Sequence, residues 1–264
     1  EANRKLGFTT KKTMMVAQQL YEGIEVDGET AGLITYMRTD SVNLSEEALE
    51  QLRELIAEKY GKENVPKAPR SFKTKSKNAQ EAHEAIRPTS AFNLPEKIKS
   101  NLTSDQFKLY ELIWKRTVAC QMIHATLNQV AVDLSCGSKD NIFRATGSTI
   151  HKPGFMAVYL EGKDDSKEGD DKESFLPPME EGRPVPLNDI IATQHFTEPP
   201  PRFGEASLVK SLEEHGIGRP STYSAIISTL QNREYVTLET KRFRPTDVGR
   251  IVNKFLTDHF TKYV

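Results

Sequence analysis

Residues 205–246, "EASLVKSLEEHGIGRPSTYSAIISTLQNREYVTLETKRFRPT", carry the clearest fold signal in the sequence. Their first part repeats apolar residues at helical spacing and stops at Gly216, a residue type that commonly follows a helix. After a tight turn, Ser221 or Thr222 is predicted to cap a second helix, because a hydroxyl oxygen there can accept a hydrogen bond from a free backbone N–H. A hairpin with basic residues is predicted over 235–246. This order of elements is that of a winged helix-turn-helix, a fold suited to contact with a nucleic-acid backbone.

The middle of the sequence, residues 121–193, has a different pattern. Apolar residues alternate with polar ones, and the loop 137–141 leads into the run 142–145, which predicts a β-hairpin. Residues 183–196 are expected to form a further strand, so an antiparallel sheet or barrel is predicted here. The charged low-complexity run 161–174 offers nothing to pack and is predicted to be a solvated loop.

Helical spacing of apolar residues dominates residues 1–120, so this part is predicted to be mostly helical. Together the patterns predict a multidomain α+β protein with domains over 1–120, 121–193 and 194–264. The expected elements of the first domain are a helix capped by Thr10, a strand over 33–38, a helix from Ser45 to Gly61, an exposed basic loop over 66–78, a short helix over 79–87 that ends at Pro88, and a helix over 104–122.

The composition of the 264 residues, 37% apolar and 28% charged, is typical of a soluble globular protein, and no apolar run is long enough to span a membrane. Cys120 and Cys136 lack C-x-x-C spacing, which excludes a zinc ribbon or a disulfide scaffold and favours a reduced, cytoplasmic protein. Residues 1–120 hold 19 basic against 17 acidic residues and residues 194–264 hold 10 against 8, whereas 121–193 hold 7 against 12. Both ends are therefore mildly basic although the net charge is −1. The lack of an initial Met indicates a processed chain or a fragment of a longer protein.

A second informative stretch is "GLITYMRTDS", residues 32–41, in which a tyrosine precedes an arginine by two positions. Side chains alternate across a strand, so Tyr36 and Arg38 are predicted to emerge on the same face. A tyrosine in a strand usually only packs. A free phenol has a pKa of about 10 and needs a base or a positive neighbour to act as a nucleophile. Arg38 stays charged and can grip two phosphate oxygens, so the pair has the chemistry for attack on a phosphodiester.

Several long motifs together resemble the type IA DNA topoisomerases. They are "GLITYMRTDS", "AQEAHEAIRP" and "HFTEPPPRFGEASLVKSLEEHGIGRPSTYSAIISTLQNREYV", supported by "KLGFTTKKTMMVAQQLYEG" and "LYELIWKRTVACQM", and they span nearly the whole chain in order. The resemblance implies that Tyr36 attacks single-stranded DNA and forms a 5′-phosphotyrosine link, that an intact strand passes through the gap, and that Arg38 positions the phosphate and stabilises its charge. Such a link keeps the energy of the broken bond, so resealing needs no ATP. No G-x-x-x-x-G-K-[ST] loop occurs in the sequence.

Three further motif residues have a structural and a functional interpretation. Asp40 can simply form a turn, whereas the resemblance implies a place in the hydrogen-bond network of the active site. His83 on an Ala-rich helix can be solvated or hydrogen-bonded, whereas the resemblance implies a contact with DNA phosphate that protonation would strengthen. Arg87 lies one turn beyond His83 on the same face of the predicted helix and is expected to bind DNA with it.

Turn and cap formation explain most of "GIGRPSTY", residues 216–223, but not Arg219. An arginine, hydroxyl groups and free N–H groups at a helix N-terminus form a phosphate site. The resemblance implies that this motif contacts the single-stranded DNA leading to the active site. Arg219, Ser221 and Thr222 are therefore predicted to bind DNA.

The resemblance also implies what lies outside this sequence. The family's N-terminal Toprim domain binds Mg²⁺ and supplies a glutamate near the tyrosine, and no motif here matches it, so no metal ligand is predicted in this chain. The chain is expected to be a central fragment, inactive alone, that acts with the Toprim domain in cis. Its three domains are expected to be the tyrosine-bearing domain, the second segment of a β-rich arch, and part of a winged-helix-like (CAP-like) base. Expected partners are single-stranded and negatively supercoiled DNA in the bacterial nucleoid, with no membrane.

A different class of function fits the same fold signals. In this alternative the protein is a non-catalytic winged-helix module that binds DNA, and Tyr36 only packs. The exposure of the phenol separates the two interpretations, because a nucleophile must be reachable and a core tyrosine need not be.

Overall fold

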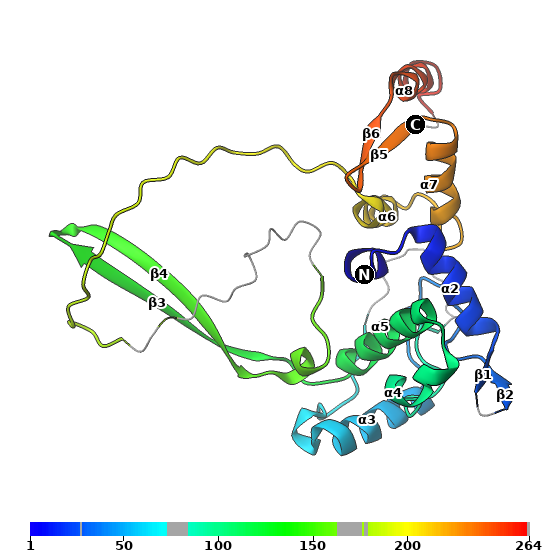
Figure 1. The fold of residues 1–264 in the computed structure, drawn as a ribbon, viewed down its shortest axis with the longest axis horizontal. Coiled ribbons are helices and arrows are strands. Elements are labelled where there is room, and N and C mark those ends of the chain that lie inside the picture. Colours follow the sequence, from blue (N-terminus) through cyan, green and yellow to red (C-terminus); the bar gives the residue numbers. More distant parts are fainter. Residues whose placement is uncertain (27, 73–83, 163–175, 177–178, 263–264) are drawn as a thin grey trace. The chain divides into compact units, whose positions relative to one another are not determined.

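The computed structural model describes residues 1–26, 28–72, 84–162, 176 and 179–262. Two compact units are present (Figure 1). Residues 1–123, 155–164 and 202–264 form the first, called here the helical unit, and residues 124–154 and 165–201 form the second, called here the hairpin unit. The three domains expected from the sequence, with boundaries near 120 and 193, stay a prediction.

Helices are the main secondary structure of the described residues of the helical unit. Their starts follow from hydroxyl caps: the side chains of Thr9, Ser45 and Thr103 accept hydrogen bonds from backbone N–H groups of α2, α3 and α5. The helices are α1 (Ala2–Leu6), α2 (Thr10–Glu22), α3 (Glu46–Tyr60), α4 (Pro95–Ile98), α5 (Ser104–Cys120), α6 (Glu205–Glu214), α7 (Tyr223–Asn232) and α8 (Asp247–His259), and short 3-10 helices lie at Lys62–Asn64, Lys99–Asn101 and Gly154–Ala157.

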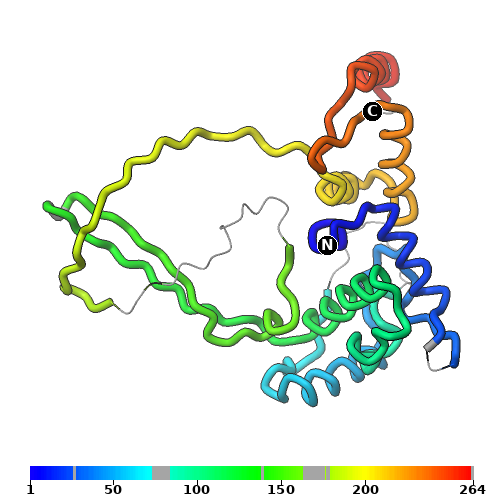
Figure 2. The backbone as a smooth tube through the Cα atoms, in the orientation of Figure 1, coloured from blue at the N-terminus to red at the C-terminus, as the bar shows by residue number. Residues whose placement is uncertain are grey.

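The strands of the described residues pair into three separate two-stranded antiparallel sheets. In the hairpin unit, β3 and β4 run from the pair Thr126 and Lys152 to a turn at Gly137, whose φ of 74° suits glycine (Figure 2). The mixed α+β class predicted from the sequence is confirmed. The strand pairs are β1 (Ile24–Val26) with β2 (Glu29–Ala31), β3 (Thr126–Cys136) with β4 (Ser138–Lys152), and β5 (Val236–Glu239) with β6 (Arg242–Pro245).

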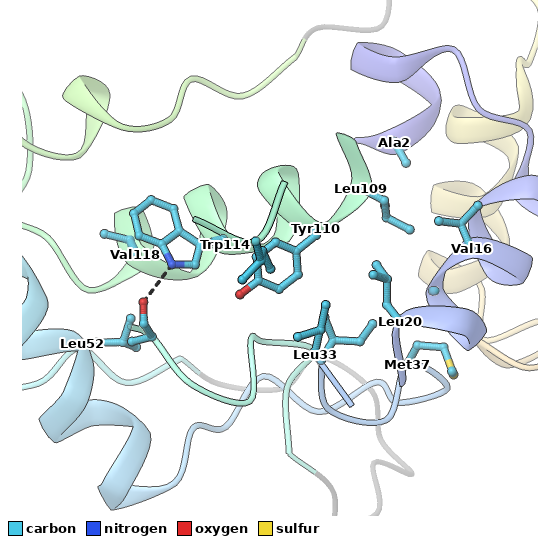
Figure 3. Packing of buried hydrophobic residues seen from close by; sticks show 14 of the residues in the cluster. Ala2, Val16, Leu20, Leu33, Met37, Leu52, Leu109, Tyr110, Trp114 and Val118 are labelled. Atoms are coloured by element: carbon cyan, nitrogen blue, oxygen red, sulfur yellow. Dashed lines mark hydrogen bonds between the residues drawn. The ribbon is translucent and has the colours of Figure 1, made fainter. Parts of the chain in front are cut away.

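One hydrophobic core joins α2, α3 and α5 (Figure 3). Its two aromatic residues on α5 also satisfy their polar atoms: Tyr110 donates to the carbonyl of Asn93 at 2.6 Å, and Trp114 donates to that of Ala91 at 2.9 Å. Each large apolar side chain buried here stabilises the fold by about 1.5–3 kcal/mol. Leu33, at 1% exposure, belongs to this core and anchors the start of the stretch that carries Tyr36.

Two local predictions near that stretch are wrong. Residues 33–38 do not form a strand: only Ile34 makes an isolated bridge, to Pro88, because the neighbouring backbone groups pair with the end of α2 and with a loop instead of a strand. Residues 84–87 of the predicted short helix are not helical, and residues 79–83 lie outside the described residues. A residue that precedes proline is biased toward extended backbone, which overrides the helical pattern before Pro88.

Three smaller predictions also need correction. The cap of α2 is Thr9, and Thr10 is its first helical residue. The further strand expected over 183–196 is absent, and these residues are exposed, with no described strand paired to them, so a single hairpin replaces the expected sheet or barrel. The β4 strand begins at Ser138, directly after the glycine turn, so the loop expected over 137–141 is shorter than predicted. In the charged run expected to be a loop, residues 163–174 lie outside the described residues.

Candidate functional site

The segment that carries Tyr36 is fixed to the end of α2. A Cβ atom at Gly32 would lie 2.6 Å from the carbonyl oxygen of Tyr21, so only glycine allows the chain to pass this close to the helix. The next residue, Leu33, donates its N–H to the carbonyl of Leu20 at 2.8 Å. These contacts set the distance between the last turn of α2 and the backbone that leads to Tyr36.

The residues on either side of Tyr36 are also held. The N–H of Thr35 donates to the carbonyl of Arg87 at 2.9 Å, and its hydroxyl donates to the carbonyl of Ala85 at 2.7 Å. In return the Thr35 hydroxyl accepts from the Arg87 N–H at 2.9 Å. Met37 is buried in the core at 2% exposure. The backbone around Tyr36 is therefore placed by tertiary contacts, although it belongs to no strand.

The Tyr36 side chain is 41% exposed, and Arg38 is exposed as well. Met37 between them is buried, and the side chains on either side of it are exposed. That Tyr36 and Arg38 share one face stays a prediction. The ring of Tyr21 lies edge-on to that of Tyr36, with centroids 5.3 Å apart and planes at 66°. The site therefore presents a phenol and a guanidinium from one short, anchored segment.

Two predicted site residues from distant parts of the sequence meet. Arg219 Nη1 lies 4.0 Å from Asp40 Oδ2, and the Asp40 side chain is only 18% exposed. Tyr223, the first residue of α7, lies close enough to be affected by both charges. Its pKa is raised, mainly by burial and next by the charge of Glu213; Arg219 has a smaller lowering effect and Asp40 a smaller raising effect. The turn before α7 thus faces the segment that carries Tyr36.

The hydroxyls in this turn act differently from the prediction. Thr222 occupies the N-cap position of α7, but its side chain caps no helical N–H. Instead its Oγ1 accepts from the Arg219 N–H at 2.8 Å and donates to the Arg219 carbonyl at 3.1 Å, which closes the turn. Ser221 is exposed beside it. Gly218 has a φ of 77°, a backbone conformation that other residues rarely adopt, so glycine suits this turn.

The Arg87 guanidinium holds a loop together. Its Nε and Nη2 donate to the two carboxylate oxygens of Glu84 at 2.7 and 3.0 Å, and Nη2 also donates to the Ser45 hydroxyl at 3.3 Å. Its Nη1 donates to the carbonyls of Pro88 and Thr89 at 2.8 and 3.3 Å. The role of Arg87 in DNA binding stays a prediction, and His83 lies outside the described residues.

Glu84 is the acidic partner in this loop. Besides its contacts with Arg87, it accepts from the N–H of Ser45, the N-cap residue of α3, at 2.7 Å. Burial alone would raise the pKa of Glu84, but the hydrogen bonds from Arg87 and Ser45 outweigh burial and lower it. Glu84 therefore ties the loop that pairs with Thr35 to the start of α3.

Sequence reasoning missed two contacts. One is the edge-on ring of Tyr21, for which the helical pattern of α2 gives no signal. The other joins α6 to α2: Glu205, 7% exposed, accepts from the N–H of Thr10 at 2.5 Å and from its hydroxyl at 2.7 Å. The contact connects residues 195 positions apart, so no local pattern predicts it.

The described part of the chain presents neither a cluster of metal ligands nor a helix that could span a membrane. It contains no group of three or more His, Cys, Asp or Glu side chains placed to hold a metal ion. Within the same residues, every helix is too short or too polar to cross a membrane.

The segment with Tyr36 and Arg38 lies next to a helix–turn–helix that is followed by a basic hairpin. Comparison with known proteins identifies the family in which these features occur. A family model described as DNA topoisomerase matches residues 1–264. The chain is 59% identical over 266 residues to DNA topoisomerase 1 of Xylella fastidiosa strain Temecula1, and the match covers 100% of this chain and 32% of that protein. It is 55% identical over 264 residues to DNA topoisomerase 1 of Rickettsia felis, with 100% and 34% covered.

A solved structure agrees with these relatives. Full-length topoisomerase I from Thermotoga maritima matches with a TM-score of 0.77 and 36% identity, over 99% of this chain and 41% of that one. The chain belongs to the DNA topoisomerase family, as a region of a bacterial type IA DNA topoisomerase I. It spans about a third of the length of the relatives that it matches. The family resemblance found in the sequence is therefore confirmed.

Proposed function

We propose that this region carries the nucleophile of a type IA topoisomerase. The Tyr36 phenolate oxygen attacks a phosphodiester of single-stranded DNA, a bond from Tyr36 to the 5′-phosphate forms, and the bond to the 3′-oxygen breaks. After an intact strand has passed, the 3′-hydroxyl attacks the same phosphorus and releases Tyr36. Each step exchanges one ester for another, so negative supercoils relax without ATP. The supporting observation is the exposed phenol beside Arg38 on an anchored segment, in contrast to the buried Tyr110.

The surrounding residues fit supporting roles. Arg38 grips the non-bridging phosphate oxygens, where negative charge gathers in the transition state. Asp40 belongs to the hydrogen-bond network around the phenol, and Arg219, 50% exposed, binds the phosphate of the incoming strand beside it. The hydroxyls of Ser221 and Thr222 lie in the same turn and add contacts to that strand.

Two further motif residues have different places in the proposal. His83 binds phosphate, as the family motif implies. The guanidinium of Arg87, predicted to bind DNA as well, already makes five hydrogen bonds, so we propose that it acts mainly by holding the Thr35 loop next to Tyr36.

The architecture supports a larger DNA-binding assembly. The order α6, α7, β5, β6, α8 is that of a winged helix (CAP-like), with Lys241 at the tip of the β5–β6 hairpin, so this part acts as the base that tracks the DNA backbone. The β3–β4 hairpin forms part of a β-rich arch. In this proposal the domains are 1–120, 121–193 and 194–264, and the parent enzyme acts in the bacterial cytoplasm, on the nucleoid.

Magnesium enters the proposal only through another part of the enzyme. The described residues contain no set of donor side chains that fits Mg²⁺, so we assign no reaction step of these residues to the ion. A Toprim domain acting in cis would hold it and assist the departing 3′-oxygen. The 264-residue chain alone is therefore expected to form no covalent adduct with end-labelled single-stranded DNA in Mg²⁺, and efficient labelling of the protein would show that its site is complete.

The decisive experiment separates the nucleophile from the alternative of a DNA-binding module with a structural tyrosine. In a full-length topoisomerase that carries this region, Tyr36→Phe is expected to abolish the covalent adduct and leave DNA affinity nearly unchanged, because the cationic residues remain. Tyr21→Phe serves as the matched control, since it removes the neighbouring hydroxyl. An adduct trapped with the Tyr36→Phe variant would refute the assignment.

A further inference from the structure

The Tyr21 ring contacts the ring of Tyr36, the proposed nucleophile. Tyr21 is the last but one residue of α2, and its ring lies edge-on to that of Tyr36, with centroids 5.3 Å apart and planes at 66°. Both side chains are 41% exposed, so neither ring is held by burial in the core. The contact therefore lies at the surface, where the phenol has to meet its substrate.

The backbones that carry the two rings are held at a fixed distance. Gly32 passes against the carbonyl of Tyr21, and the Leu33 N–H donates to Leu20 at 2.8 Å. With Thr35 hydrogen-bonded and Met37 buried, the backbone at Tyr36 is placed, and the direction of its phenol depends on its two side-chain torsions. Whatever limits these two torsions decides where the phenol oxygen points.

An edge-to-face ring contact restricts such rotation. Aromatic pairs at this separation favour tilted geometries, and the preference changes a rotamer population by roughly two- to tenfold. Attack on phosphorus requires the phenol oxygen about 3–3.5 Å from the reacting atom and in line with the leaving oxygen. A ring that is pre-oriented reaches this geometry more often than one that rotates freely.

We propose that Tyr21 is a positioning residue for the reaction: its ring holds the Tyr36 phenol in the orientation from which it attacks DNA. The inference rests on the proposed role of Tyr36 as nucleophile. It predicts that the ring matters and the hydroxyl of Tyr21 does not. It also predicts that cleavage and resealing slow together, because both pass through the same placement of the Tyr36 oxygen.

The ring contact is tested first in the 264-residue chain, which needs no activity. With ¹³C-labelled tyrosine rings, the Tyr36 resonances are assigned by their loss in Tyr36→Phe. Tyr21→Leu is expected to shift them, because the ring current of Tyr21 is removed, whereas Tyr21→Phe keeps them near their original positions. Phe92→Leu, at a similarly exposed aromatic residue, is the matched control. Unchanged Tyr36 resonances in Tyr21→Leu would overturn the inference.

The consequence for the reaction is measured in a full-length topoisomerase that carries the same substitutions. Tyr21→Leu is expected to slow both adduct formation and resealing by about two- to tenfold, with DNA affinity and thermal stability unchanged and with Tyr21→Phe close to wild type. Wild-type rates in Tyr21→Leu would overturn the inference even if the resonances shift. If the wild-type full-length enzyme forms no adduct, the proposed function is refuted and the inference with it. The Tyr36 resonances would then show only that the ring contact exists.

Discussion

The contact between Glu205 and Thr10 offers a quantitative test of how α6 is attached to α2. One carboxylate oxygen of Glu205 accepts from the N–H of Thr10 at 2.5 Å and from the Thr10 hydroxyl at 2.7 Å. Thr10 is the first residue of α2, whose first N–H groups have no partner within the helix. Glu205→Gln keeps the size of the side chain and removes its charge, and Thr10→Val removes the hydroxyl and keeps the N–H.

The expected cost follows from these contacts. Hydrogen bonds to a charged group contribute about 1.5–3 kcal/mol each, roughly twice as much as neutral ones. The negative charge near the start of a helix adds about 0.3–1 kcal/mol. A glutamine oxygen still accepts, so Glu205→Gln should lose roughly half of the contribution of the two hydrogen bonds and all of the charge effect, about 2–4 kcal/mol of unfolding free energy. In a double-mutant cycle with Thr10→Val, we expect a coupling of about 1 kcal/mol.

Two measurements read this effect. Urea unfolding is followed by the fluorescence of Trp114, the single tryptophan of the chain, which is buried in the helical unit at 3% exposure. Amide exchange then reports the contact itself: the Thr10 N–H should lose protection in Glu205→Gln, whereas the Lys12 N–H, bonded to Thr9 at 3.1 Å, should not. Glu214→Gln, at an exposed position of the same helix, is the control, with an expected change below about 0.5 kcal/mol.

Two outcomes would contradict a stabilising role for Glu205. If Glu205→Gln and Glu214→Gln unfold at the same urea concentration, the buried carboxylate contributes no stability. If the Thr10 amide keeps its protection in Glu205→Gln, the charge is not needed for the contact between α6 and α2.

Three other predictions concern the site and its loop. In a full-length topoisomerase, Arg38→Lys should slow adduct formation by about tenfold or more, because a point charge cannot reproduce a two-pronged grip, and a wild-type rate would contradict the clamp. For a labelled single-stranded oligonucleotide, Arg219→Gln should reduce the slope of log affinity against log salt concentration by about one. Arg87→Gln should leave this slope unchanged and lower the midpoint of thermal unfolding. The reverse outcome would exchange the roles of the two arginines. The pKa of Glu84 is lowered in the folded protein, so its contribution to stability is present above its ordinary pKa of 4.5 and is lost as the pH falls through the folded pKa. Glu84→Gln should therefore flatten the acid side of a stability–pH curve. An identical curve would count against the Glu84 contacts.

Local chemistry decided which elements the sequence could predict. The α3 helix begins after Ser45 and ends before Gly61, as its hydroxyl and glycine signals indicate. The β5–β6 hairpin forms where basic and apolar residues alternate around Thr240 and Lys241, both with positive φ. These signals lie within a few residues of the structure that they specify, so tertiary contacts do not override them.

Long-range pairing explains what the sequence could not predict. Residues 33–38 look like a strand, but their partners are a loop and the end of a helix, and nothing local states which partner an extended segment takes. The motif that carries Tyr36 and Arg38 could be recognised from the family resemblance. Neither the Tyr21 ring nor the carboxylate of Glu205 belongs to a recognisable motif, because each acts through a residue distant in sequence.

The two arginines predicted to bind phosphate show why residue type alone does not define a binding site. The Arg87 side chain is 13% exposed, and its five hydrogen bonds would have to be given up before it could reach DNA. The Arg219 side chain is 50% exposed, and its contact with Asp40 is at 4.0 Å, a distance at which an ion pair near water contributes little. In the proposed function, phosphate therefore meets an exposed guanidinium at Arg219, whereas at Arg87 it would dismantle the loop that holds Thr35 beside Tyr36.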